Sequence, residues 1–243
     1  MRRLVLALLA TAVCSQLASA ADIPPAPPPA PAPYYKPALP PIFSWTGFYL
    51  GLHGGGAWGK KDWSDPIIGG LGSHDVSGGI AGGQIGFNYQ AGGVVFGVEV
   101  DAAWAGLKGS HNILGFPGLV AETKVDFIGS VTGRLGAAWG MALLYVKGGG
   151  AWAHDKYDVT VAGISAATAA ETRWGWTVGA GLEYAFSPAW SAKIEYNYMD
   201  FGTKTVTFTG IGGLTGTADI GQNLNVVKAG FNYRFGGPLY AAY

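Results

Sequence analysis

Charged side chains repeat at every second position in several parts of this chain, a spacing that could serve acid and base chemistry. Glu99 and Asp101 form one such pair, and Lys193 and Glu195 form another. General acid–base catalysis uses paired titratable groups beside a substrate cleft. The same segments also supply lysine and arginine, so ion pairing is the simpler use of these carboxylates. No serine–histidine spacing suggests an activated nucleophile, and we do not expect an enzyme.

Three histidines lie in stretches rich in Gly, Ser, Thr and Ala, namely His74, His111 and His154. Histidine can ligate haem iron, but axial ligation needs a shaped pocket around the metal. Isolated loop histidines are more commonly solvated polar residues. We therefore expect no cofactor and no metal site.

The elements that carry these residues are best seen in the segment 223–235, where polar and apolar side chains alternate. One set of positions is apolar: Val227, Ala229, Phe231, Tyr233 and Phe235. The other set is polar or small: Lys228, Gly230, Asn232 and Arg234. Successive side chains of a strand point to opposite faces. One face therefore suits lipid and the other a polar lumen, as in the strand of a membrane barrel.

Eight segments alternate in this way: 48–58, 78–89, 96–104, 123–136, 142–153, 174–186, 191–198 and 223–235. Only 12% of residues are charged, yet no apolar run past the N-terminus approaches the about 20 residues of a spanning helix. The pattern predicts an all-β, eight-stranded antiparallel transmembrane β-barrel. The alternative is a soluble two-sheet sandwich, but aromatic residues recur at strand ends, which favours two interfacial belts of a barrel.

The connections between these segments alternate in length. Short links at 90–93, 137–141 and 187–189 contain turn-forming or small residues, whereas the other four links are long. This predicts short periplasmic turns and long surface loops, with both chain ends on the periplasmic side.

The inward set of positions carries both signs of charge. We expect a lumen charge network of Glu99, Asp101, Asp126, Arg134, Lys147, Arg173, Glu183, Lys193, Glu195, Lys228 and Arg234, with Lys124 on the same face. An eight-stranded barrel is just wide enough for side chains to fill its interior. Mixed charges would pair across it and plug the lumen, although a narrow ion path stays open as an alternative.

The N-terminus has the pattern of an export signal. Residues 1–20 combine Arg2 and Arg3, an apolar core and a small-residue site, so we expect cleavage after Ala20. Acylation at Cys14 is the less favoured alternative. Most of the chain's 14 prolines follow, which predicts a periplasmic tether at 21–46 rather than a docking ligand. The barrel is expected at 47–235 and a short tail at 236–243.

The opening WTGFYLGLHGGGAWG from Trp45 to Gly59, the eight-segment plan and the NYRF close resemble the alphaproteobacterial outer-membrane immunogenic protein family, within the porin-family, OmpA-like barrels. The resemblance implies a surface protein in the outer membrane of a Gram-negative bacterium. The filled, charge-paired lumen in turn favours a structural barrel that contributes to envelope integrity. A narrow porin-like channel and a surface haemin-binding protein are the alternatives.

The resemblance further implies partners. Lys228, Gly230, Tyr233 and Phe235 are similar to the C-terminal signal of the barrel-assembly machinery. Ala21, followed by Asp22, is similar to the peptidoglycan attachment point of some relatives. Outer-membrane lipid and lipopolysaccharide are expected to surround the barrel. Nucleic acid is not expected, because the net charge is zero and no basic block occurs. The oligomeric state is left open.

Overall fold

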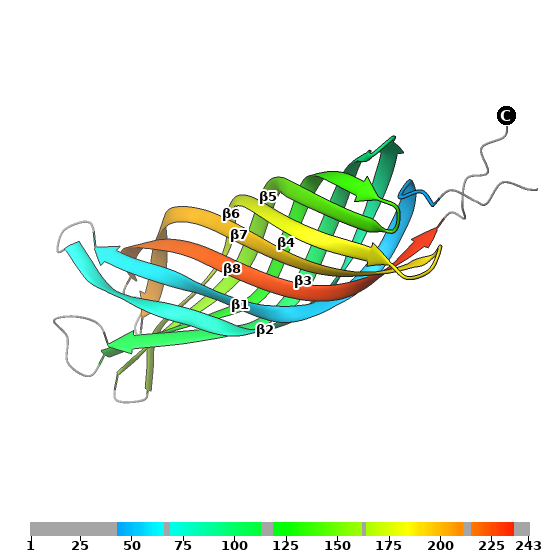
Figure 1. Ribbon diagram of the computed structural model, residues 1–243. Helices are drawn as coiled ribbons and strands as arrows, with labels where there is room; N and C mark the ends of the chain where they lie inside the picture. Colours follow the sequence, from blue (N-terminus) through cyan, green and yellow to red (C-terminus); the bar gives the residue numbers. More distant parts are fainter. Residues whose placement is uncertain (1–42, 66–68, 113–118, 162–163, 211–214, 236–243) are drawn as a thin grey trace, which may run out of the picture. The chain divides into compact units, whose positions relative to one another are not determined.

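Eight antiparallel strands close into a barrel (Figure 1). The computed structural model describes residues 43–65, 69–112, 119–161, 164–210 and 215–235. The strands are β1 (Gly47–Asp65), β2 (Gly69–Ala91), β3 (Val94–Asn112), β4 (Leu119–Trp139), β5 (Ala142–Val161), β6 (Ile164–Ala185), β7 (Trp190–Gly210) and β8 (Thr215–Phe235). The predicted all-β, eight-stranded barrel is therefore confirmed. In the described part of the chain, no helix is long and apolar enough to cross a membrane.

The barrel closes between its first and last strands, where Phe48 faces Phe235. The first residues of β1 and the last residues of β8 lie at the same end of the barrel (Figure 1). The tight turns between strands lie at this end too. Gly92 and Gly140 in these turns have φ of 60° and 59°, a left-handed conformation that glycine adopts without strain. We call this the turn end and the opposite end the outer end.

The strands run further toward the outer end than the sequence pattern predicts. β1 continues from Trp58 to Asp65, and β2 begins at Gly69, so most of the long loop expected between them is paired strand. Hairpin pairing satisfies the backbone polar groups of these Gly- and Ser-rich segments. His74, His111 and His154, expected in loops, accordingly lie in strands.

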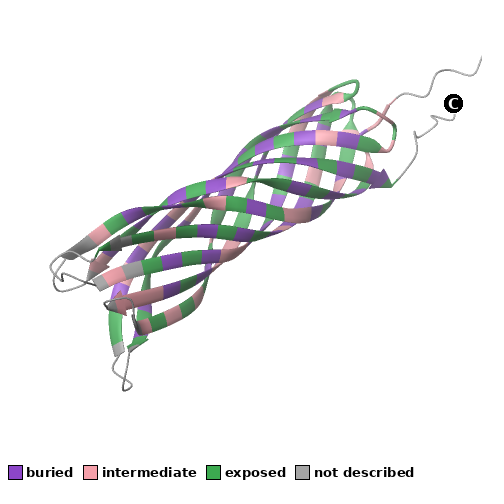
Figure 2. Cartoon of the chain, turned by 90° about the horizontal axis from the view of Figure 1, so that it is seen from below, coloured by how far each residue is buried: buried purple, intermediate pink, exposed green. Residues whose placement is uncertain are grey.

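The outer face of the wall carries an apolar band between two aromatic belts, and buried and exposed residues alternate along the strands (Figure 2). Leu52 is 73% exposed and Trp104 is 75% exposed, which in a soluble protein would be costly. The belt toward the outer end comprises Trp58, Trp104, Trp152 and Trp174. The belt at the turn end comprises Tyr89, Trp139, Phe186, Trp190, Tyr233 and Phe235. This surface matches the depth profile of a bilayer.

Beyond the tryptophan belt the outer face becomes polar. Lys60 and Asp62 follow Trp58 on β1, and Lys156 follows Trp152 on β5, all with exposed side chains. Lipid does not solvate such charges, so the strands extend past the bilayer into water. We call this part the outer extension.

Register shifts change which side chains face inward. On β4, a shift between Val125 and Phe127 turns Val125 into the lumen and leaves Lys124 and Asp126 on the outer face. The inward assignment of Lys124 and Asp126 is therefore wrong. A bulge adds one residue to a strand and reverses the alternation beyond it. The sequence pattern, taken as a period of two along the whole of β4, places the residues up to the bulge on the wrong face.

Candidate functional site

The candidate site is the interior of the barrel, where alternate residues of all eight strands converge. Ten of the predicted network residues are buried: Glu99, Asp101, Arg134, Lys147, Arg173, Glu183, Lys193, Glu195, Lys228 and Arg234. The structure brings eight of them into one cluster. Arg173 belongs to a second cluster nearer the outer end, and Arg234 lies at the turn end.

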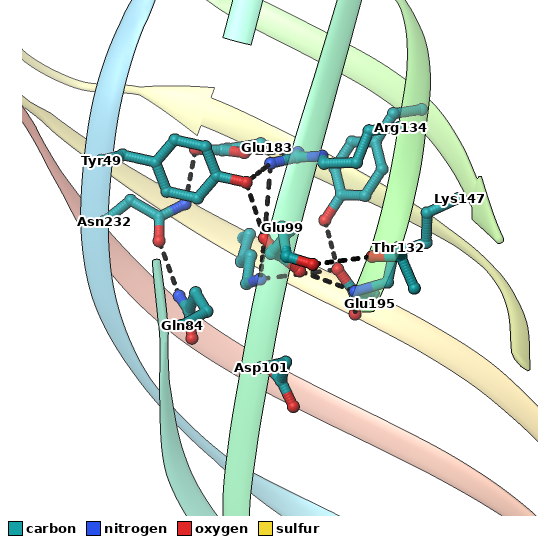
Figure 3. Close-up of polar contacts among 12 residues, drawn as sticks. Tyr49, Gln84, Glu99, Asp101, Thr132, Arg134, Lys147, Glu183, Glu195 and Asn232 are labelled. Atoms are coloured by element: carbon teal, nitrogen blue, oxygen red, sulfur yellow. Dashed lines mark hydrogen bonds and ion pairs between the residues drawn. The ribbon is translucent and has the colours of Figure 1, made fainter. Parts of the chain in front are cut away.

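Glu99 on β3 is the hub of the central cluster (Figure 3). Its two carboxylate oxygens lie 2.6 Å from Lys147 Nζ and 3.2 Å from Lys193 Nζ. Arg134 Nη1 is 3.5 Å away, and Arg134 Nη2 donates to Glu183 at 2.9 Å. Five neighbouring strands, β3 to β7, thus contribute to this cluster of buried side chains.

Glu195 on β7 is a second acceptor for the same cations. It lies 2.9 Å from Lys147 Nζ, 3.2 Å from Lys228 Nζ and 3.5 Å from Lys193 Nζ. Lys228 also contacts Asp101 at 2.6 Å. Four carboxylates therefore face four cations in the cluster: Glu99, Asp101, Glu183 and Glu195 against Arg134, Lys147, Lys193 and Lys228. The formal charges balance, so no counter-ion is required.

Neutral polar side chains complete the cluster. Tyr49 Oη donates to Glu99 at 2.9 Å and accepts from Arg134 at 2.7 Å (Figure 3). Tyr145 Oη donates to Glu195 at 2.7 Å, and the Arg134 guanidinium lies 3.9 Å from the centre of the Tyr145 ring. A buried network is stabilising when its members are satisfied, and the two tyrosines add one hydrogen bond each to Glu99, Arg134 and Glu195.

The second cluster centres on Asp155 of β5. Lys61 Nζ is 3.1 Å from Asp155, and Arg173 Nε is 3.3 Å from it. Arg173 also donates to the Ile220 carbonyl at 2.7 Å. Lys61 and Asp155 were not predicted, because β1 and β5 extend beyond the predicted segments 48–58 and 142–153. Both residues lie an even number of positions after an inward-facing residue of the same strand, Ala57 on β1 and Lys147 on β5. Continuing the period of two along each strand would therefore have predicted them as inward-facing.

The turn end is closed by residues expected to belong to the tether. Trp45 is fully buried; its backbone N–H donates to Gln90 Oε1 at 2.7 Å, and its indole N–H donates to the Gly140 carbonyl at 3.3 Å. The Arg234 guanidinium lies 4.4 Å from the ring of Phe43 and 4.6 Å from that of Trp45. It also donates to Pro188 O at 3.0 Å. Residues 43–46 thus form a floor.

Apolar layers separate the polar clusters. Trp45, Val95, Leu143, Tyr145 and Ala185 pack together at the floor. A middle layer between the two polar clusters includes Ala57, Val76, Leu107, Val125, Ile128, Ala151, Met199, Phe201, Leu224 and Val226. An outer layer comprises Trp63, Tyr157, Val206, Phe208, Ala218 and Ile220. β5 passes through all five levels in order, at Leu143, Lys147, Ala151, Asp155 and Tyr157.

The remaining predicted residues have other positions. Asp126 lies on the outer face, where its carboxylate contacts Lys156 at 2.6 Å and Lys124 at 3.4 Å. Of the four residues predicted to signal assembly, Lys228 and Gly230 face inward, whereas Tyr233 and Phe235 face outward at the turn end. Ala21 lies outside the described residues.

The described residues hold no group of three or more His, Cys, Asp or Glu that could bind a metal ion. His74 is buried inside the barrel, and His154 lies on the outer face, where its ring nitrogen is 3.2 Å from Thr172 Oγ1. The wall of the barrel separates these two histidines.

A closed antiparallel barrel with an apolar outer band, two aromatic belts and a charged interior defines an outer-membrane β-barrel protein. The family model described as outer membrane protein beta-barrel domain matches residues 6–235. The chain belongs to this family of outer-membrane proteins, and its place is the outer membrane of a Gram-negative bacterium, surrounded by lipid and lipopolysaccharide.

Relatives support the alphaproteobacterial resemblance. The chain is 35% identical to the 31 kDa outer-membrane immunogenic protein of Brucella melitensis, over 97% of this chain and 100% of that protein. It is 32% identical to the 22 kDa outer membrane protein of Rhizobium leguminosarum, over 80% of each chain. The crystal structure of OprG from Pseudomonas aeruginosa is similar in fold, with a TM-score of 0.54 and 16% identity over 80% of this chain and 99% of that one.

Proposed function

We propose that the protein is a structural component of the outer membrane whose lumen is closed to solutes. The observation that carries this proposal is the filled interior: two ion clusters alternate with three apolar layers along the barrel. An ion crossing it would have to pass apolar layers that offer no hydration, a barrier of several kcal/mol or more. The protein's contribution is then mechanical, through its wall and its anchoring.

Deletion and complementation test this role in the bacterium. Loss of the gene is expected to raise sensitivity to detergent and chelator, because the envelope loses a rigid barrel. The full chain should restore resistance, and so should a Trp58→Phe variant, which keeps an aromatic side chain in the outer belt. Unchanged resistance on deletion, together with reduced uptake of a small solute, would instead indicate a channel.

We infer further that residues 21–46 tie the barrel to peptidoglycan through Ala21. The anchoring of Phe43 and Trp45 beneath the barrel supports this proposal, because a tether transmits force only if its barrel end is held. A muropeptide joined to Ala21 in purified sacculi is the expected product. A free amine on Ala21 in all sacculus-associated protein would contradict the attachment while leaving the closed lumen untouched.

The other roles considered have less support. Haemin binding by His74 together with His154 is not favoured, because these two side chains lie on opposite sides of the wall. Catalysis by Glu99 is not favoured either, because three cations hold that carboxylate below an apolar layer and away from any substrate. We therefore propose a non-enzymatic role.

A further inference from the structure

Three lysines form a row across neighbouring strands of the outer extension. Lys108 on β3 faces Lys124 on β4, and Lys124 faces Lys156 on β5. All three are exposed, with side-chain exposure of 52% for Lys124 and 56% for Lys156. Like charges directly opposite each other on one face of a sheet are destabilising. Negative charge close to the three lysines would therefore stabilise the row.

The protein supplies part of this charge. Asp126 bridges Lys124 and Lys156, whereas Lys108 forms no ion pair among the described residues. The next outward-facing row toward the outer end contains Ser110, Glu122, Asp158 and Thr168, in which Glu122 faces Asp158. Basic and acidic rows thus lie side by side on one exposed surface.

These rows line a cleft of about 1100 Å³. Its wall also includes the hydroxyl-bearing residues Thr207 and Thr209 of β7. The cleft opens on the outer face of the wall, because most of its lining residues are exposed members of the outward-facing rows. The buried, inward-facing Thr123 and Tyr157 also contribute to its lining. Ammonium groups suit an anionic substituent, while carboxylates and hydroxyls suit the hydroxyl groups of a sugar.

The cleft lies just beyond the outer tryptophan belt. Lys108 follows Trp104 by four residues on β3, and Lys156 follows Trp152 by four residues on β5. At about 3.3 Å per residue, this places the lysines about 13 Å further along each strand. Tryptophan belts mark the membrane–water interface, so the lysines lie on the water side of it, where large sugar headgroups project from the leaflet.

We propose that this cleft binds the phosphorylated sugar headgroup of a glycolipid in the outer leaflet. Lys108, Lys124 and Lys156 contact the phosphate, and the Glu122 row contacts sugar hydroxyls. The site goes beyond the structural role proposed above and does not depend on a closed lumen. Lipid bound here would fix the barrel to the leaflet that surrounds it.

Equilibrium binding to the refolded full chain tests the site, with diphosphoryl lipid A as the probe in zwitterionic detergent. Combined replacement Lys108→Gln/Lys124→Gln/Lys156→Gln should weaken binding at least about tenfold, since each lysine near an anionic headgroup contributes to affinity. Lys124→Gln alone should weaken it less. Lys60→Gln is the matched control, because that lysine is 54% exposed on the outer extension but lies outside the cleft. The heat-dependent shift in gel mobility verifies that each variant is folded.

Two further probes distinguish the source of the phosphate. Dephosphorylated lipid A should bind more weakly than the diphosphoryl form, and inorganic phosphate at the same concentration should not displace it. Equal affinity of the triple variant and the unmodified protein would overturn the proposal. Inorganic phosphate that binds as tightly as lipid A would also overturn it, because the site would then serve a free anion.

Discussion

Glu99 is a buried carboxylate whose charge is balanced by three different cations. Its carboxylate neutralises Lys147, Lys193 and Arg134 while being almost completely buried. Removing one partner of a buried ion pair leaves uncompensated charge and costs about 3–5 kcal/mol. Lys147 and Lys193 also contact Glu195, so the energetic effects of replacing these residues are expected to be coupled.

Glu99→Gln is therefore expected to lower the free energy of unfolding by about 3–5 kcal/mol. Urea unfolding of the protein in lipid vesicles measures this change. The double variant Glu99→Gln/Lys193→Met should lose less than the sum of the two single variants, because it removes opposite charges together. Asp62→Asn, in an exposed pair with Lys60, is the control and should change stability by less than about 1 kcal/mol. An equal effect of Glu99→Gln and Asp62→Asn would contradict a buried network.

At the scale of the strands, close backbone contact across the sheet explains part of the glycine content. A Cβ on Gly149 of β5 would lie 2.1 Å from the Val131 carbonyl oxygen of β4, whereas a Cβ on Gly150 would meet nothing within 4 Å. The two positions are adjacent in one strand, so they form a matched pair. Only the first requires glycine for its close approach.

Gly149→Ala is expected to destabilise the barrel by about 1–3 kcal/mol, because the β4–β5 pair must move apart. Gly150→Ala should be neutral or slightly stabilising, since it restricts the unfolded chain. Thermal loss of the folded gel band compares the two variants. Similar melting of both would show that cross-strand contact does not govern glycine at these positions.

The end of β8 makes a separate prediction about assembly. Tyr233 and Phe235 pack edge to face on the outer surface, with ring centres 5.0 Å apart, and contribute little to the interior. Phe235→Ser is expected to reduce the amount of folded protein in the outer membrane severalfold. Refolding of the same variant in detergent should be nearly unchanged. A defect of the same size in both settings would assign Phe235 to stability and not to recognition by the assembly machinery.

The strands were largely predictable from the sequence, because one face meets lipid and the other a filled lumen. That contrast gives Phe231 and Lys228 opposite faces without ambiguity. The contrast between the two faces is lost beyond the tryptophan belt, where the outer face meets water and no longer lipid. For this reason the sequence predicts a loop after Trp58, although the structure has paired strands there. The bulge that turns Val125 inward and Asp126 outward breaks the period itself. The charge network could be predicted as a set of residues, but its pairing depends on strand register.

For the whole molecule, the floor that contains Trp45 closes the turn end of the barrel. Trp45 is fully buried, although the proline-rich composition before it suggested only a tether. Its contacts join residues 43–46 to the turns between strands, through Gln90 and the Gly140 carbonyl. No local pattern in the sequence reveals such a contact, because its partners lie far along the chain.

Trp45→Ala is expected to lower the free energy of unfolding by about 3–5 kcal/mol through loss of buried area. It should also make residues 43–46 accessible to proteinase K while the barrel remains folded. Trp45→Phe is the control, since it keeps most of the apolar contact and should protect the segment. Equal protection of the alanine variant would show that the floor is held by other contacts.

Planar-bilayer recording of the refolded protein tests the central claim most directly, since that claim is a lumen closed at several levels. No stable openings are expected from the unmodified protein. Trp45→Ala should also remain closed, because the middle apolar layer and the Asp155 cluster still block the path. Stable stepwise openings in the unmodified protein would contradict the filled lumen and indicate a channel.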